Sequence, residues 1–292
     1  MLDRHAYLIM CHQNIEQLKI LLSLLDYELN DIYIHADKKL SLSDDEKNRI
    51  CSALKKSNCY FIKSQYGSWG GDSLMKIEIS LLKKATESEH KYYHLISGAD
   101  LPLKSQSFIH NWFNNDGKDY FCIRHEANGT ELFLDRFRYY YIFQNLIGRK
   151  RNSLMVKIRN GFVRVQKLIG INRMKNANFE YVKADQWFSI THNTAKFILA
   201  QYPLYKKYFV CSFVPDESFI YTIIKNSSLV DNLIDDSLRY IDWNRGEPYT
   251  FGKDDFDELI NSSKLFARKF DINYDKEIVD KIYGYVIQFD NN

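Results

Sequence analysis

The chain has 292 residues, of which 45% are apolar and 26% are charged, and its formal net charge is +3. This length is enough for one large α/β domain or two small ones, and the composition excludes a disordered or fibrous protein. No apolar run approaches the length of a membrane-spanning helix, and the N-terminus carries neither a signal peptide nor a cleavage site. We therefore expect a cytoplasmic protein.

The five cysteines are scattered, and none belongs to a C-x-x-C pair. This spacing gives little support to a zinc site or a redox motif. Mostly free, buried thiols in a reducing compartment are the simplest interpretation. The cysteines are Cys11, Cys51, Cys59, Cys122 and Cys211.

The N-terminal part alternates short apolar strands with amphipathic helices. The strands are predicted at residues 5–11, 31–35 and 59–62. One helix is expected from about Asn14 and a capped one from near Ser43. This order favours a sheet with helices on both faces, where ligands bind beyond the C-terminal ends of the strands. His35 and Asp37 fall at such an end.

The rest of the chain continues the same alternation. A glycine-rich turn at 66–73 leads into a helix, but its spacing is not that of a phosphate loop and no Gly-Lys-Ser/Thr follows, which argues against a nucleotide kinase. Further strands are predicted at residues 92–97, 119–123, 186–191 and 239–243. We see no linker, repeat or low-complexity segment, and therefore predict one domain over 1–292.

The stretch from Val214 to Thr222 carries two adjacent carboxylates at a predicted helix start. Pro215 resists a place inside a helix, while Asp216 and Glu217 lie where the first turn favours negative charge. A carboxylate held there above an apolar face is rigid and partly desolvated, as a general base must be. Ordinary helix capping is the alternative interpretation.

Five stretches, in this order along the chain, resemble the family of core-2/I-branching β-1,6-N-acetylglucosaminyltransferases and peptide O-xylosyltransferases. Together they cover nearly the whole chain, and the membrane anchor and disulfide framework of the animal members are missing, as in a bacterial, soluble relative. The stretches are Tyr33–Lys38, Trp69–Ser73, His94–Lys104, Pro215–Phe219 and Leu265–Asp271.

The resemblance implies a GT-A nucleotide-sugar-binding fold, an α/β domain with a central, mostly parallel or mixed sheet and helices on both faces. Residues 1–125 would form mainly the nucleotide-sugar half. Residues 126–292 would form mainly the acceptor half, with the catalytic base and a diphosphate-binding tail. It also implies inverting transfer from a UDP-sugar without a bound metal or other cofactor.

Site residues follow from the resemblance position by position. Glu217 matches the base that takes the proton of the acceptor hydroxyl, and Lys269 matches the diphosphate-binding lysine, with Arg268 beside it. Trp243 matches an aromatic residue that packs on the acceptor sugar. On the donor side, the residues expected near the uridine or the donor sugar are Asp37, His35, Trp69 and Asp100.

Three arginines are weaker matches. The second phosphate-binding arginine of the animal members aligns with Gly246, so either a one-residue gap gives Arg245 that role or Arg268 supplies the second charge. The segment 131–175, where the acceptor would be chosen, matches poorly, and Arg136 and Arg138 are the candidates there. Asp255-Phe256-Asp257 is a literal D-x-D, but its place at a predicted helix start favours helix capping over metal binding.

A basic stretch lies between residues 149 and 175, with nine Lys/Arg and no Asp or Glu. Apolar residues recur in it at helical spacing, at Met155, Ile158, Phe162, Val165, Leu168 and Ile169. Two interpretations are open: a basic outer face packed on the domain, or a helix on an anionic membrane surface that brings the protein to a lipid-linked acceptor on the inner face of the cell membrane.

The sequence thus predicts a glycosyltransferase that moves a sugar, preferably N-acetylglucosamine, from UDP to a hydroxyl of a glycan in surface polysaccharide synthesis. Transfer of xylose or another sugar is the alternative within the class. A glycoside hydrolase that uses Glu217 with Asp100 or Asp216, and a carbohydrate-binding module without activity, are the rivals from other classes. No nucleic-acid partner is expected.

Overall fold

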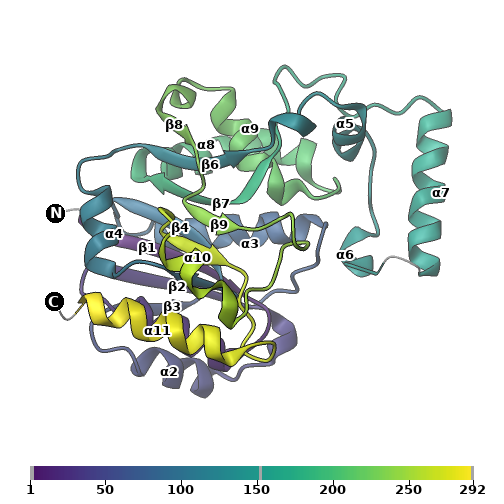
Figure 1. Cartoon of the computed structure of the whole chain (residues 1–292). Helices are drawn as coiled ribbons and strands as arrows, with labels where there is room; N and C mark the ends of the chain where they lie inside the picture. Colours follow the sequence, from purple (N-terminus) through teal and green to yellow (C-terminus); the bar gives the residue numbers. More distant parts are fainter. Residues whose placement is uncertain (1–2, 151–152, 291–292) are drawn as a thin grey trace.

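The computed structural model describes residues 3–150 and 153–290, which form a single α/β domain around a mixed sheet (Figure 1). The sheet order is β3-β2-β1-β4-β7-β6-β8. Strands β1 to β4 are parallel, and β7 runs antiparallel to both β4 and β6. The predicted fold class is confirmed. The strands are β1 His5–Cys11, β2 Asn30–Ala36, β3 Asn58–Phe61, β4 Tyr92–Ser97, β6 Asp119–Ile123, β7 Ala184–Thr191 and β8 Leu233–Asp235.

Strand β1 shows why helices must cover both faces of this sheet. All seven of its residues are buried. Alternate side chains point to opposite faces of a strand, and Leu8 accordingly packs in one apolar cluster while Ile9 packs in the other. A strand buried on both faces reads as a continuous apolar run, which is the pattern seen in the sequence.

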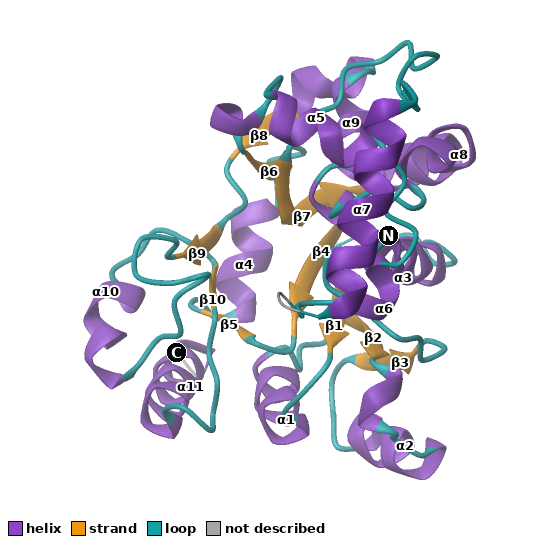
Figure 2. Ribbon diagram, turned by 90° about the vertical axis from the view of Figure 1, so that its right-hand side faces the viewer, coloured by secondary structure: helices purple, strands orange, loops and turns teal. Residues whose placement is uncertain are grey.

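Helices α3 and α8 cover one face, and α1, α4 and α11 cover the other. Figure 2 shows the second group on the side of the sheet opposite to α3. The helices are α1 Ile15–Leu24, α2 Asp44–Ser52, α3 Asp72–Ala85, α4 Gln106–Phe113, α5 Glu131–Arg138, α6 Gln144–Ile147, α7 Leu154–Leu168, α8 His192–Phe209, α9 Phe219–Lys225, α10 Phe256–Ile260 and α11 Lys276–Asp290. Within the described residues, none is long and apolar enough to cross a membrane.

The two predicted halves of the chain are not separate units, because they share the central sheet. Strand β6, which ends the first half, pairs with β7 and β8 from the second half.

A second, three-stranded sheet holds segments that lie far apart in the sequence. It consists of β5 Asp100–Pro102, β10 Phe266–Arg268 and β9 Arg239–Ile241, in the order β5-β10-β9. The strand predicted at 239–243 therefore exists but belongs to this small sheet. In Figure 2 the small sheet lies beside the main one, on the side of α10 and α11.

Arg239 joins the two sheets. Its side chain extends from β9 and donates to the carbonyl of Phe188 at 2.6 Å and to Ser189 Oγ at 2.8 Å, both in β7. It also donates to the carbonyl of Leu95 in β4 at 3.2 Å, and its guanidinium lies 5.0 Å from the ring centre of Phe266. A buried arginine is stable only when its donors find such partners.

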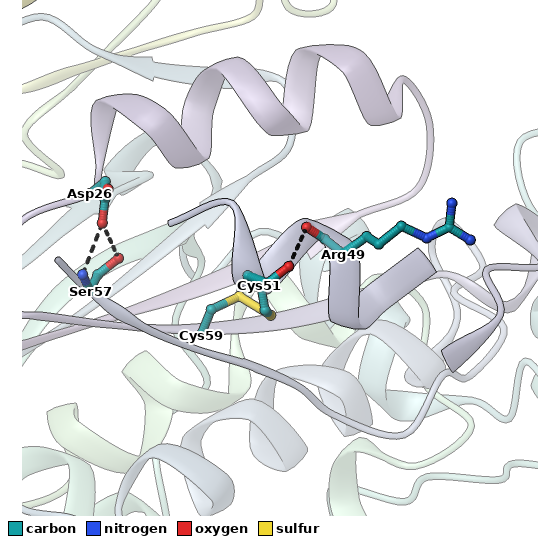
Figure 3. Close-up of a disulfide and its surroundings, with 6 residues drawn as sticks. Asp26, Arg49, Cys51, Ser57 and Cys59 are labelled. Atoms are coloured by element: carbon teal, nitrogen blue, oxygen red, sulfur yellow. Dashed lines mark hydrogen bonds between the residues drawn. A yellow bond between two sulfur atoms is a disulfide. The ribbon is translucent and has the colours of Figure 1, made fainter. Parts of the chain in front are cut away.

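The structure corrects the prediction for two of the cysteines. Cys51, near the end of α2, and Cys59 in β3 form a disulfide (Figure 3). Asp26 fixes the turn between them by accepting the backbone N–H groups of residues 55–57. The expectation of mostly free thiols holds for Cys11, Cys122 and Cys211.

We expect Arg239→Met to lower the free energy of unfolding by about 2–4 kcal/mol, because it leaves buried acceptors of two strands without their donor. Urea denaturation of both proteins measures the difference. Arg49→Met, at an exposed position on α2, is the matched control and should change stability by less than about 0.5 kcal/mol. Equal effects of the two substitutions would contradict the role of Arg239.

Candidate active site

The candidate site lies at the carboxyl ends of the parallel strands, at the point where the strand order changes direction. The chain moves outward from β1 through β2 to β3 and then returns to β4 on the other side of β1. Open α/β sheets bind ligands at such a switch point. Asp37 directly follows β2, Ser97 is the last residue of β4, and Asp100 comes three residues later.

Asp37 and His35 hold the loop that borders this edge. Asp37 accepts the N–H of Gly67 at 2.8 Å and that of Lys39 at 2.9 Å. His35 is buried, and its Nε2 accepts the N–H of Gln65 at 3.0 Å. Both predicted donor residues thus have a supporting role in the structure, and His35 is in the protein interior. Position 67 must be small, since a Cβ there would lie 3.0 Å from the Asp37 carboxylate.

Asp100 and Arg268 form a buried pair across the small sheet. They are register partners of β5 and β10, and Arg268 Nη1 lies 3.4 Å from Asp100 Oδ1. The same carboxylate accepts from the N–H and the hydroxyl of Ser97, at 3.0 and 2.7 Å. Arg268 also stacks 4.0 Å from the ring centre of Trp187. Its buried Nη1 makes no hydrogen bond within the described residues, and the Asp100 charge is what balances it there.

Lys269 lies next to Arg268 in a cluster of cations that includes an unexpected member, Arg149. Partial burial, together with the charges of Arg149 and Arg268, lowers the pKa of Lys269. Burial and the same two arginines also lower the pKa of His12 at the end of β1. Lys269 has no ion pair among the described residues. Cations that repel one another are favourable neighbours for a bound anion.

Arg149 was not singled out from the sequence as a site residue. It precedes α7 and is separated from Lys269 by more than a hundred residues, so spacing could not connect them. The signal that pointed to it was the acid-free basic stretch of residues 149–175. Arg151 of that stretch lies outside the described residues.

Glu217 ends a 3₁₀ turn, Pro215–Glu217, that leads directly into α9. The predicted helical start is therefore confirmed. The Glu217 carboxylate is partly exposed, and its Oε2 accepts from Arg136 Nη1 at 3.3 Å and lies 3.9 Å from Lys183 Nζ. Arg136, which was expected near the acceptor, thus contacts the predicted base Glu217. Lys183 was missed, since nothing in its local sequence marks it.

Arg138 does not share this position. Two residues apart on a helix, side chains point to nearly opposite sides, and Arg138 pairs with Glu131 at 2.6 Å and with Asp135 at 2.8 Å on its own helix α5. Its charge is already neutralised there, which argues against the predicted contact with the acceptor.

Trp243 and Trp69 are both partly exposed aromatic residues at the rim. The Trp243 ring lies 5.3 Å from the guanidinium of Arg124, which forms a bidentate pair with Asp185 at 2.6 and 2.9 Å. The Asp185 charge also acts on Arg268, so Arg124 and Asp185 stand between Trp243 and the cation cluster. Trp69 meets Phe213 edge-on, with ring centres 5.8 Å apart.

The ion pairs of Arg245 argue against its predicted role in the donor site. Its guanidinium is held by Asp242, by Asp255 at 2.7 Å and by Glu258 at 3.0 Å, so its charge is satisfied within the protein. The same contact explains the D-x-D stretch, where Asp255 ends a 3₁₀ turn before α10. Among the described residues, no three His, Cys, Asp or Glu side chains gather as a metal site.

Comparison with known proteins agrees with this geometry. The family model described as Core-2/I-Branching enzyme matches residues 5–260. The chain belongs to the Core-2/I-branching enzyme family. The match includes the switch-point loops, Arg149 and the Glu217 turn, whereas Arg268 and Lys269 lie just beyond it.

Two relatives of this Core-2/I-branching enzyme are xylosyltransferases by name. Xylosyltransferase 2 of Rattus norvegicus is 22% identical over 310 residues, which cover 96% of this chain and 33% of the relative. Xylosyltransferase sqv-6 of Caenorhabditis briggsae is 25% identical over 279 residues, which cover 85% of this chain and 32% of the relative. The chain therefore spans about a third of the length of these curated relatives.

Next to the partly exposed Glu217, this Core-2/I-branching enzyme buries two further carboxyl groups. Burial, together with the charge of Glu217, raises the pKa of Asp216 to about 8. Burial and the charge of Asp216 raise the pKa of Glu78 well above its usual range. Gln186 donates to Glu78 at 2.5 Å. One oxygen of each carboxyl group has no partner among the described residues, so both groups are stable here only when protonated.

We expect stability to fall as the pH rises through the titration range of Asp216. Between its usual pKa of 3.8 and about 8, the folded state holds a proton that the unfolded state has lost, which makes folding less favourable as protons become scarce. Asp216→Asn removes this dependence. Its stability gain over the unmodified protein should grow from pH 5 to pH 8, reaching at least about 1.4 kcal/mol, the equivalent of one pH unit.

Urea denaturation across this pH range measures the effect. Asp254→Asn, at an exposed position of the 3₁₀ turn before α10, is the control and should show a difference that does not vary with pH. Parallel stability curves for Asp216→Asn and the unmodified protein would contradict the prediction.

Proposed function

We propose that this chain is an inverting glycosyltransferase that moves a sugar from UDP to a hydroxyl of a glycan acceptor. One observation carries the proposal beyond family membership. The chain combines a single partly exposed carboxylate, Glu217, held by two cations, with a second cluster in which Arg149, Arg268 and Lys269 interact at the switch point. A single displacement requires a base on the acceptor side and positive charge at the leaving group.

Glu217 would take the proton of the acceptor hydroxyl. As that proton moves to the carboxylate, the acceptor oxygen forms a bond to the anomeric carbon, and the bond from that carbon to the phosphate oxygen breaks with its electron pair. Arg136 and Lys183 both approach Oε2. This leaves Oε1 as the oxygen for the acceptor, and the two cations fix its direction.

Lys269, Arg268 and Arg149 would receive the diphosphate. The departing UDP gathers negative charge on its phosphate oxygens, and fixed cations stabilise that charge without reorganisation during the reaction. Arg268 offers a planar set of donors and Lys269 a compact charge. We therefore propose transfer that does not require a divalent metal ion, with the UDP-sugar as co-substrate and no cofactor.

Two donor sugars are candidates. The sequence favours N-acetylglucosamine, while the names of the relatives favour xylose. Identity of 22–25% leaves room for a changed sugar pocket. The acceptor we propose is a glycan of a surface polysaccharide, carried by a lipid.

The arrangement argues against a glycoside hydrolase. Such enzymes place two carboxyl groups on either side of the scissile bond. Asp100 is fully buried and bound to Ser97 and Arg268, and Asp216 faces the interior. Neither carboxyl group is accessible to a sugar as Glu217 is. In a hydrolase, the cations around Lys269 would also have no function.

Calorimetric titration with UDP, UDP-N-acetylglucosamine and UDP-xylose, each with and without excess EDTA, tests the donor site. We expect uridine nucleotides to bind with an affinity that EDTA does not change, and one sugar to be preferred. Binding that EDTA abolishes would overturn the metal-independent mechanism. Absence of any uridine nucleotide binding would overturn the transferase proposal.

We expect Glu217→Gln to lower kcat by about a hundredfold or more, because the amide cannot accept the proton, while UDP binding stays unchanged. UDP release from the preferred UDP-sugar, with water as the acceptor, gives the rate. Glu180→Gln, at an exposed position outside the site, is the control. Unchanged turnover in Glu217→Gln would remove Glu217 as the base and favour a binding protein.

Lys269→Ala and Arg149→Ala should each weaken UDP binding by about tenfold, as expected for loss of one charge-assisted hydrogen bond. Lys150→Ala, the exposed neighbour of Arg149, is the matched control and should bind UDP normally. Calorimetry at constant ionic strength measures all three. If Arg149→Ala binds UDP like Lys150→Ala, Arg149 does not belong to the donor site.

A further inference from the structure

Helix α7 exposes most of its large apolar side chains to solvent. Within this described helix only Gln166 is buried, and Gln166 exchanges hydrogen bonds with the backbone of Tyr140 at 2.8 and 3.0 Å. Arg159, on the same side, donates to Gln144 of α6 and lies 5.4 Å from the ring centre of Phe213. The half-buried Met155, Val156 and Val163 complete this inner side, so polar and apolar side chains share the contact with the domain.

The opposite side carries a continuous apolar stripe. Positions 154, 158, 162, 165, 168 and 169 fall within about 120° of arc on a helix with 3.6 residues per turn, and all six side chains are exposed. Leu154 is 72% exposed and Leu168 is 86% exposed. Surface helices of globular proteins normally turn the apolar stripe inward. Figure 1 shows α7 standing apart from the sheets, beyond α5 and α6.

The charge around this stripe has one sign. From residue 149 to 175 the chain contains no Asp or Glu. Lys157 and Arg164 lie along one edge of the stripe by helical spacing, and both are exposed. Long basic side chains at the edge of an apolar stripe can reach lipid headgroups while the stripe enters the acyl boundary.

We propose that the outer face of α7 docks on an anionic membrane surface. The apolar stripe would lie in the headgroup and acyl boundary, with Lys157 and Arg164 against acidic headgroups. The observations favour this partner over a second copy of the chain. Because residues 149–175 contain no Asp or Glu, the same segment of a second copy offers these cations no carboxylate. In an antiparallel pair of α7 helices the two basic edges would also lie against each other and repel.

Membrane docking adds to the proposed function and rests on it, because it matters for catalysis only if the chain is a glycosyltransferase. A membrane-docked α7 would hold the site at the surface where a lipid-linked acceptor is found. Binding to lipid and binding to UDP are separate measurements, so either proposal can fail alone.

The test is sedimentation of the purified full chain with vesicles of phosphatidylcholine, with or without phosphatidylglycerol, at about 0.05 M and about 0.5 M salt. We expect binding to the anionic vesicles at low salt and weaker binding at high salt. Leu168→Asp should lower the partition coefficient by about tenfold or more, and Lys157→Glu with Arg164→Glu should lower it by about thirtyfold.

Matched variants keep the test specific. Leu204→Asp replaces an exposed leucine of α8 that is 63% exposed, and Lys55→Glu with Lys56→Glu reverses two exposed charges near β3. Both controls should bind vesicles like the unmodified protein, and UDP affinity in solution should be unchanged in Leu168→Asp.

Three results would overturn the proposal. The first is no binding to anionic vesicles at low salt. The second is equal loss of binding in the α7 variants and their controls. The third is a dimer in analytical ultracentrifugation that Leu168→Asp dissociates, because the stripe would then be covered by a second copy.

Discussion

Arg239 connects the sheet that carries the fold to the small sheet that carries the cations. Its guanidinium reaches from β9 to the carbonyl groups of Phe188 and Leu95 in the main sheet. Strand β10 pairs with β9, and it ends in Arg268, next to Lys269. A shift of Arg239 would therefore move the cation cluster relative to Glu217, which is attached to the other side of the main sheet through α9. A catalytic site whose residues come from two sheets needs a rigid connection of this kind, because a misplacement of about 1 Å can lower the reaction rate strongly.

The turn at residues 215–217 separates two adjacent carboxyl groups by environment. Asp216 points inward toward Glu78, where no cation pairs with it among the described residues, and its pKa is raised by burial. Glu217 points outward toward Arg136 and Lys183. When the surroundings of two neighbouring acids differ this strongly, one fold can give them different tasks. The 3₁₀ turn makes the separation possible within two residues.

The sequence could predict what depends on local pattern. The apolar runs of β1 and β4 and the charged helix start at Asp216 are such patterns. The mixed sheet and the position of Glu217 were predicted from the family resemblance. Strands β5 and β10 have three residues each, too few for periodicity to detect. Arg245 and Arg149 show the other limit. Both are basic side chains in the sequence, yet three carboxylates neutralise Arg245, while the charge of Arg149 acts on Lys269. Only the tertiary structure decides this.

Helix α7 is also linked to the donor side of the site. Arg159 of α7 donates to the side-chain oxygen of Gln144, and the amide nitrogen of the same residue donates to the carbonyl of Trp69 at 2.9 Å. The next carbonyl, that of Gly70, accepts the N–H of Val214, which precedes the turn of Glu217. These bonds connect α7 with the loop at Trp69 and with the turn that carries Glu217. A partner of α7 changes activity only if it binds one position of α7 better than another.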